Sequence, residues 1–194
     1  MLPNVGEPAL DFRPATSVEP GRRFANPKVA QAVMFARELL ATAELGLADA
    51  QSSDPRRWTS GLYVAIVFGR SVTFALQNGQ SEDQAFEEWY LGWQQQMKKD
   101  ARMSYMDRLR VSIVHQVGPP ARRQGTRITY DDVPGLEGVS LEAPWGGALN
   151  WTVRPVIRFD DSPFDEPADF LIRTYLDYLT RIVEDAERRF SRPI

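Results

Sequence analysis

An arginine and a histidine five positions apart are the residues of this chain whose types and spacing could do chemistry. Arg110 and His115 lie in the run Leu109–His115, and His115 is the only histidine of the sequence. A histidine titrates near neutral pH, so a side chain that gains or loses a proton there can exist at only one place in this chain. Arg110 and His115 are therefore the candidate catalytic residues.

The spacing of this pair imposes two conditions. Positions five apart on a regular helix point about 140° away from each other. The two side chains therefore face one cleft only if the helix is distorted or its last turn unwinds. One histidine also cannot easily act as both acid and base, so the hypothesis includes a homodimer in which two copies line one cleft. The alternative is structural: Arg110 pairs with a carboxylate on a neighbouring helix, and His115 stabilises a helix C-terminus.

Positive charge is concentrated around the pair. The chain as a whole has a net charge of -3 and a pI of about 5.3, which gives nucleic acid no overall basic surface. Between residues 101 and 127, however, Asp107 is the single acid among six arginines. These arginines include Arg108, Arg122 and Arg123. One interpretation is that they are solvated arginines on a helix and a loop.

The composition excludes several classes of function. The sequence has no cysteine, so disulfides, thiol catalysis and thiolate metal sites are absent. Its acidic pairs, such as Asp131-Asp132 and Asp160-Asp161, lack the spacing of a calcium loop. No signal peptide opens the chain, and Arg70 interrupts its longest apolar stretch, Leu62–Leu76. We expect a cytoplasmic protein with no membrane span, no metal and no cofactor. A buried Arg70 would need a partner such as Glu38, Glu44 or Asp177.

Periodicity and cap signals indicate helices over most of the chain. Residues 1–25 are rich in proline and lack periodicity, which predicts an irregular arm before a single domain at 26–194. Asn26-Pro27 and Asp54-Pro55 each predict a helix start, and Ser81 with Gln84 has capping-box spacing. A third helix carries an aromatic stripe, which we interpret as core or interface, and a fourth runs to His115. The stripe consists of Phe86, Trp89, Tyr90, Trp93 and Met97.

A change of pattern at about 124–160 predicts a β insertion. Short segments rich in β-branched and aromatic residues lie at 126–130, 138–141, 150–153 and 156–159, as in a hairpin or a three-stranded sheet. Pro155 is expected to end or bend one strand. Helical periodicity returns after Pro167 and continues to Phe190. The predicted fold is an all-α antiparallel bundle of four to five helices with this insertion before the last helix.

The pair and its place in the bundle resemble the HEPN superfamily of helical domains. Its signature is an arginine, four to six intervening residues and a histidine, and Arg110 and His115 have four between them. The resemblance covers about 26–117 and the last helix. It implies a bacterial, metal-independent endoribonuclease that acts as a homodimer, with a possible regulatory protein partner. In such an enzyme His115 would move the proton of the RNA 2′-hydroxyl group, and Arg110 would stabilise the charge that builds on the phosphate. The resemblance also makes Arg108, Arg122 and Arg123 candidate RNA contacts. Arg108, with six intervening residues, is a second arginine candidate.

A second function remains open beside the ribonuclease. Val111 stands where active members of the superfamily often have a polar residue. Together with the acidic pI, this favours a non-catalytic dimeric helical module that binds a protein or small-molecule partner. The ribonuclease is the more specific hypothesis, and the binding module is its alternative.

Overall fold

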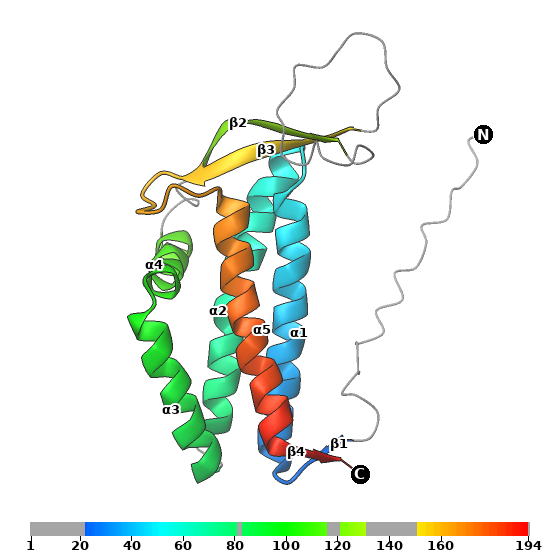
Figure 1. The fold of residues 1–194 in the computed structure, drawn as a ribbon, viewed down its shortest axis with the longest axis vertical. Coiled ribbons are helices and arrows are strands. Elements are labelled where there is room, and N and C mark those ends of the chain that lie inside the picture. Colours follow the sequence, from blue (N-terminus) through cyan, green and yellow to red (C-terminus); the bar gives the residue numbers. More distant parts are fainter. Residues whose placement is uncertain (1–21, 81–82, 116–120, 131–150, 194) are drawn as a thin grey trace, which may run out of the picture.

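The computed structural model describes residues 22–80, 83–115, 121–130 and 151–193. Within them the chain forms five α-helices and two small antiparallel sheets (Figure 1). In chain order the elements are β1 (Arg22–Phe24), α1 (Pro27–Ala50), α2 (Pro55–Gln80), α3 (Gln84–Lys99), α4 (Ala101–His115), β2 (Ala121–Tyr130), β3 (Trp151–Phe159), α5 (Ala168–Phe190) and β4 (Ser191–Pro193). The prediction of a helical bundle with a small sheet before the last helix is confirmed.

The helices begin where side chains can accept hydrogen bonds from their first turns. The Asn26 side chain accepts from the Lys28 amide at 2.9 Å, and Pro27 supplies the fixed φ of the first turn of α1. Asp54 accepts from the Arg56 amide at 2.9 Å at the start of α2. The cap of α3 is Asp83, which accepts from the Phe86 amide at 3.0 Å. Ser81, where the predicted capping box begins, lies outside the described residues; the cap that the structure shows is the carboxylate of Asp83, two residues later.

α1 and α2 form a closely packed antiparallel pair along most of their length. Two glycines mark the closest approach of their backbones. A Cβ atom added at Gly61 would lie 2.3 Å from the backbone nitrogen of Ala50, and one added at Gly46 would lie 2.5 Å from that of Ala65. Only a residue without a side chain fits at such a distance. The two glycines therefore set how closely this pair can pack.

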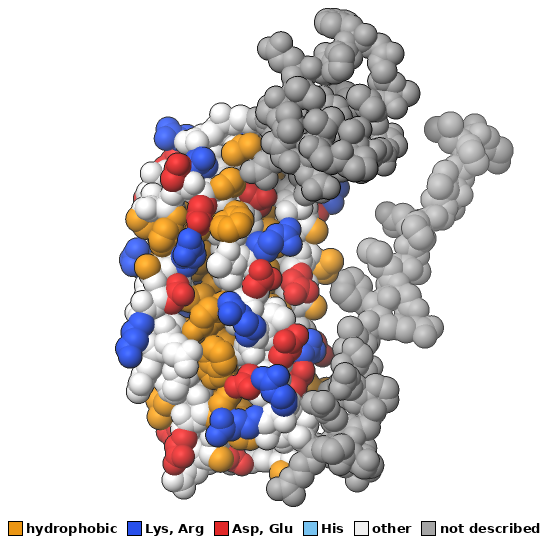
Figure 2. All heavy atoms as spheres, in the orientation of Figure 1, with side chains coloured by type: hydrophobic (Ala, Val, Ile, Leu, Met, Phe, Trp, Pro, Cys, Tyr) orange, Lys and Arg blue, Asp and Glu red, His pale blue; other side chains and the backbone are white. Residues whose placement is uncertain are grey.

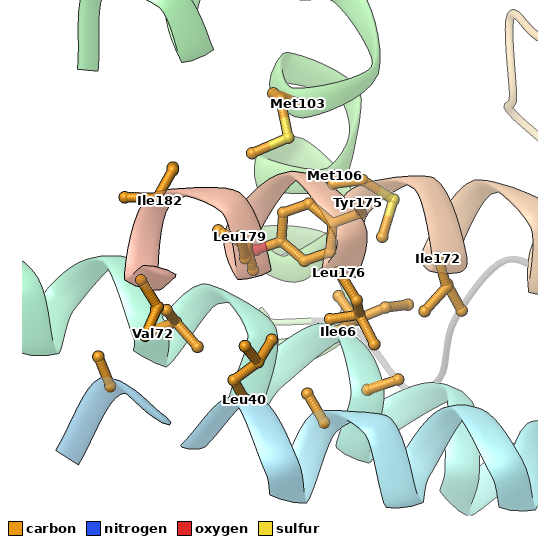
Figure 3. Packing of buried hydrophobic residues seen from close by; sticks show 14 of the residues in the cluster. Leu40, Ile66, Val72, Met103, Met106, Ile172, Tyr175, Leu176, Leu179 and Ile182 are labelled. Atoms are coloured by element: carbon orange, nitrogen blue, oxygen red, sulfur yellow. The ribbon is translucent and has the colours of Figure 1, made fainter. Parts of the chain in front are cut away.

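α5 packs against α1 and α2 on one side and α4 on the other. Figure 3 shows Leu176 of α5 beside Ile66 of α2, with Leu40 of α1 below and Met106 of α4 above. All four side chains are buried, with exposed fractions between 0% and 3%. In Figure 1, α4 is seen end-on, so it crosses the direction of the other helices. The core therefore lies along α5, where all the other helices meet.

The aromatic stripe of α3 belongs to this core, as predicted. Phe86 and Tyr90 are fully buried, and Trp89 is 7% exposed. The indole nitrogens of Trp89 and Trp93 donate hydrogen bonds to Oδ2 of Asp185 on α5, at 2.8 and 3.2 Å. Burial by itself would raise the pKa of Asp185, but hydrogen bonds from Trp89, Arg188 and Trp93 outweigh it and lower the pKa below its usual value. The carboxylate thereby fixes α3 to α5.

The β insertion is a two-stranded hairpin across one end of the bundle. β2 pairs with β3 in antiparallel register, with an irregularity between Arg123 and Gly125. Pro155 does not end β3, which continues through it opposite Thr126. In a two-stranded sheet the missing N–H of proline can face outward without losing a ladder bond, which explains why the strand does not end there. The alternative, that Pro155 bends the strand, stays a prediction. The predicted segment 138–141 lies outside the described residues.

A second small sheet joins the two ends of the described chain. β1 pairs with β4, with Arg22 opposite Pro193 and Phe24 opposite Ser191, at the end of the bundle away from the hairpin (Figure 1). Residues 22–24, which were expected to belong to an irregular arm, form the short strand β1. Residues 1–21 of that arm lie outside the described residues. Strands of three residues are too short to show any periodicity.

The surface carries both signs of charge. Figure 2 shows Lys and Arg interspersed with Asp and Glu, beside a narrow seam of hydrophobic side chains. Among the described residues, α2 is long and apolar enough to cross a membrane, but half of the relevant window is buried inside the bundle. A core helix has the same features. The prediction that the apolar stretch is a buried helix is confirmed for Leu62, Ile66 and Leu76, each at most 1% exposed.

Candidate functional site

The predicted catalytic residues both lie on α4, which stays helical through His115. Positions five apart on such a helix point about 140° away from each other. The Arg110 side chain is half-buried, and its Cζ atom lies 5.8 Å from the centroid of the Phe74 ring on α2. The side chain of His115 lies outside the described residues. A cleft shared by Arg110 and His115 therefore stays a prediction. The carboxylate partner expected for Arg110 stays a prediction too, since among the described residues Arg110 has only the contact with Phe74.

The three predicted RNA-contacting arginines lie on two different elements. Arg108 is exposed on α4, with its Cζ atom 5.9 Å from the centroid of the Tyr105 ring. Arg122 and Arg123 lie on β2. Arg122 forms an ion pair with Asp160 at 2.9 Å, and Nε of Arg123 donates to the Gly125 carbonyl oxygen at 3.3 Å. Their RNA contacts stay a prediction.

Acids from distant parts of the sequence reduce the local positive charge. Besides Arg122, Arg102 is paired, with Glu166 at 2.8 Å. Asp160 and Glu166 lie far outside the window of residues 101–127 in which the excess of arginines was counted. The folded protein is thus less basic around α4 than the sequence indicates.

Arg70 is at the centre of a different cluster, between α2 and α4. Its Nε atom lies 2.7 Å from Oδ1 of Asp107. The expected partners Glu38, Glu44 and Asp177 are wrong, because Arg70 leaves α2 toward α4 rather than toward α1 or α5. The buried Nε–H is close to the carboxylate but not aligned with it, and it has no hydrogen-bond acceptor among the described residues. The contact is a charge pair with an unused donor.

Further groups hold the Arg70 side chain in place. The Nη1 atom of Arg70 donates to the Thr73 hydroxyl, which in turn donates to the Arg70 carbonyl oxygen at 2.8 Å. The Arg70 guanidinium also lies over the Phe74 ring, with Cζ 4.3 Å from the centroid. Cation–π contacts of this kind favour a fixed orientation of the guanidinium plane. Arg70 is therefore preorganised, although its side chain is 28% exposed.

The Arg70 cluster opens into a pocket of about 360 Å³ between α2, α3, α4 and α5. Pockets of this size accommodate small molecules. Two cations and one acid line it, together with neutral hydrogen-bonding groups and two methionines. The lining residues are Arg70, Thr73, Gln77, Tyr90, Gln94, Met97, Lys98, Met103, Ser104, Asp107 and Tyr175.

Two buried tyrosines form the inner wall of this pocket. The Tyr90 hydroxyl donates to the Thr73 carbonyl oxygen at 2.6 Å. Tyr175 of α5 is 3% exposed, and its ring lies against Gly69, where a Cβ atom would come within 2.6 Å of Cε1. Tyr175 lines the pocket together with Tyr90, so both phenol rings form part of its wall. Among the described residues, the buried side-chain donor without a partner is the Nε–H of Arg70.

Burial raises the pKa of both tyrosines. The pKa of Tyr90 rises to about 12, with nearby Arg70 and hydrogen bonds to Gln94 and Thr73 opposing the shift. Burial raises the pKa of Tyr175 as well, and the Arg70 charge opposes that shift. Both groups therefore stay protonated at neutral pH. They act as hydrogen-bond donors and not as bases.

A comparison with protein families gives one match. Residues 46–118 match the family model described as bacteriophage lambda protein ea47. The match covers fewer than half of the 194 residues, namely the end of α1 and all of α2, α3 and α4. All the lining residues of the pocket except Tyr175 fall within it. No curated protein and no solved structure matches the chain.

The resemblance to the HEPN superfamily is wrong. Arg110 and His115, whose spacing carried it, lie within the residues that the ea47 model matches. Two residue types at a permissive spacing occur often by chance on a helix, and α4 is rich in arginine. The sequence analysis also missed the pocket. The one sequence feature that could have pointed to the pocket is Asp107, a lone acid among arginines. In the folded protein it lies beside Arg70.

Proposed function

We propose that this protein is a helical binding module whose pocket between α2, α3, α4 and α5 takes a small molecule with an anionic group. The observation that carries the proposal is the Nε–H of Arg70, which is buried, has no hydrogen-bond acceptor among the described residues and belongs to a side chain that lines the pocket. The proposal corresponds to the alternative function in the sequence analysis, a non-catalytic helical module that binds a small-molecule partner. The proposal includes a cytoplasmic location.

The donors of the pocket support an anionic ligand. Arg70 and Lys98 line it with positive charge, and the unaligned Nε–H of Arg70 adds a directional donor. A guanidinium fork matches the two oxygens of a carboxylate or phosphate group. Asp107 holds the guanidinium in place and leaves the pocket with one more cation than anions. Met97 and Met103 offer an apolar surface for the rest of the ligand.

The same residues support binding rather than catalysis. A general base needs a pKa near the working pH. No histidine is among the described residues that line the pocket, and its two tyrosines have raised pKa values. The ea47 match supports the choice of this region, since it spans three of the four helices that form the pocket.

The test compares ligands of the same shape and different charge. Benzoate and phenyl phosphate are expected to raise the melting temperature, whereas benzamide and benzylammonium are not. Tyr175→Phe removes a hydroxyl from the pocket wall and leaves the buried ring in place, so it should change stability little. The variant should weaken benzoate binding about tenfold, the usual effect of losing one hydrogen bond to a charged group.

Tyr105→Phe is the matched control. The Tyr105 hydroxyl donates to Oδ1 of Asp161 at 3.0 Å, and Tyr105 does not line the pocket. This variant should lose about 1 kcal/mol of stability and keep its affinity for benzoate. Equal stabilisation by benzoate and benzamide would contradict an anionic ligand. Unchanged benzoate affinity in Tyr175→Phe would contradict the site.

A further inference from the structure

The Arg70–Asp107 pair presents both of its charges to the pocket. Nε of Arg70 lies 2.7 Å from Oδ1 of Asp107, and both residues line the pocket. Their side chains are 28% and 55% exposed, so the fold leaves both charges within reach of a ligand. Asp107 faces Arg70 through Oδ1, and the second oxygen of a carboxylate is an acceptor as well. The pocket therefore offers a cation and an anion side by side.

A ligand with an anionic group alone uses only half of this arrangement. An anion that reaches the Arg70 guanidinium also comes close to the Asp107 carboxylate, because 2.7 Å separates the nearest atoms of the two groups. Like charges repel each other more strongly in a partly buried site than in water. A ligand that carries an ammonium group next to its anionic group pairs with both residues. The ammonium then turns the repulsion by Asp107 into an attraction.

The pocket also has an apolar surface close to this charge pair. Met103 lies four residues before Asp107 on the same face of α4, or about 6 Å along the helix axis. Figure 3 shows Met103 above the ring of Tyr175, which lines the pocket as well. Met97 of α3 completes this surface. An apolar group attached directly to the charged end of a ligand would therefore meet methionine and aromatic side chains one helical turn away.

We infer that the ligand of this pocket is a free α-amino acid with an apolar side chain; the inference rests on the proposed function. A single carbon atom joins the ammonium and the carboxylate of an amino acid, so its two charges lie side by side like those of the Arg70–Asp107 pair. Both groups are charged at neutral pH. The carboxylate faces Arg70, the ammonium faces Asp107, and the side chain lies along Met97 and Met103.

Calorimetric titration of the full chain with three ligands that share a phenyl ring tests the inference. Phenylalanine should bind about tenfold more tightly than 3-phenylpropionate, because its ammonium adds a hydrogen bond to the charged Asp107. The third ligand, 2-phenylethylamine, lacks the carboxylate and should bind most weakly. If 3-phenylpropionate binds as tightly as phenylalanine, the inference is overturned and the proposed function stands. If neither carboxylate binds, both are overturned.

Asp107→Asn separates a contact with the ligand from a role in positioning Arg70. The variant should weaken phenylalanine binding about tenfold and leave 3-phenylpropionate binding unchanged or tighter. Equal losses for both ligands would mean that Asp107 acts only by holding Arg70, and would overturn the inference.

Asp160→Asn is the matched control for this variant. Asp160 also faces the Nε atom of an arginine, Arg122, at 2.9 Å, and its side chain is 46% exposed, but it does not line the pocket. The control should leave the affinity for both ligands unchanged. If it weakened phenylalanine binding as much as Asp107→Asn does, the assignment of the ammonium to Asp107 would be wrong.

Discussion

The close packing of α1 on α2 makes the effect of one methyl group predictable. A Cβ atom at Gly61 would lie 2.3 Å from the Ala50 nitrogen, 2.6 Å from the Gly46 oxygen and 2.7 Å from the carbonyl carbon of Asp49. All three are backbone atoms and cannot rotate away. Since ordinary contact distances begin at about 3.5 Å, Gly61→Ala requires the helices to separate by about 1 Å.

The expected loss of stability follows from two opposing contributions. Overpacking costs about 3 kcal/mol when nothing flexible can yield, and alanine regains about 1 kcal/mol of helix propensity. The net loss is about 2 kcal/mol, or a melting temperature about 4–8 °C lower for a chain of this size. Thermal unfolding followed by circular dichroism measures it.

Gly92→Ala is the matched control for this substitution. Gly92 lies within α3, and a Cβ atom there would have no neighbour within 4 Å. The same exchange should stabilise the protein by about 0.5–1 kcal/mol, because only the propensity changes. If Gly61→Ala were as stable as Gly92→Ala, the reasoning from close packing would be refuted.

Three further predictions concern protonation and catalysis. Folding lowers the pKa of Asp185, so its contribution to stability is present above pH 3.8, the pKa in the unfolded chain, and is lost as the pH falls through the lower pKa of the folded protein. Asp185→Asn should therefore reduce the loss of unfolding free energy at acidic pH, as measured by urea unfolding. Because the pKa of Tyr90 is raised, its contribution is present below pH 10 and is lost as the pH rises toward about 12; tyrosinate absorbance should lag behind that of free tyrosine, and simultaneous titration would contradict this. With RNA in EDTA, we expect the wild type and His115→Ala to show the same absence of cleavage, whereas cleavage by the wild type alone would support the Arg110–His115 hypothesis.

The helical fold was predictable because its signals are local. Proline after Asn26 and after Asp54 marks two helix starts, and apolar residues at three- and four-residue spacing mark the buried faces. The pairing of β1 with β4 was not predictable, since it joins residues about 170 positions apart with three residues on each strand. Asp83 competed with Ser81 for the same cap, and spacing could not decide between them.

The candidate pocket depends on contacts that a linear pattern does not contain. Tyr175 has the spacing of a core residue, and it is one. Its role at the pocket follows only from Gly69, which lets the ring cross α2 and reach the Arg70 cluster. Likewise, the count of arginines near His115 omitted Asp160 and Glu166, which approach only after folding. A count of charges along a sequence predicts the local electrostatic potential poorly when acids from distant segments pair with those charges in the folded protein.

The antiparallel pairing of β1 with β4 has a mechanical consequence. Arg22 and Pro193, the outermost pair, lie at the open end of the two strands. Tension applied to both ends of the chain would therefore separate the pairs one at a time instead of loading them together. The force would next reach α1 and α5, which leave the sheet at the same end of the bundle, and peel them apart from there (Figure 1). Pulled by its ends, this bundle should yield at low force by unzipping, however stable it is to heat.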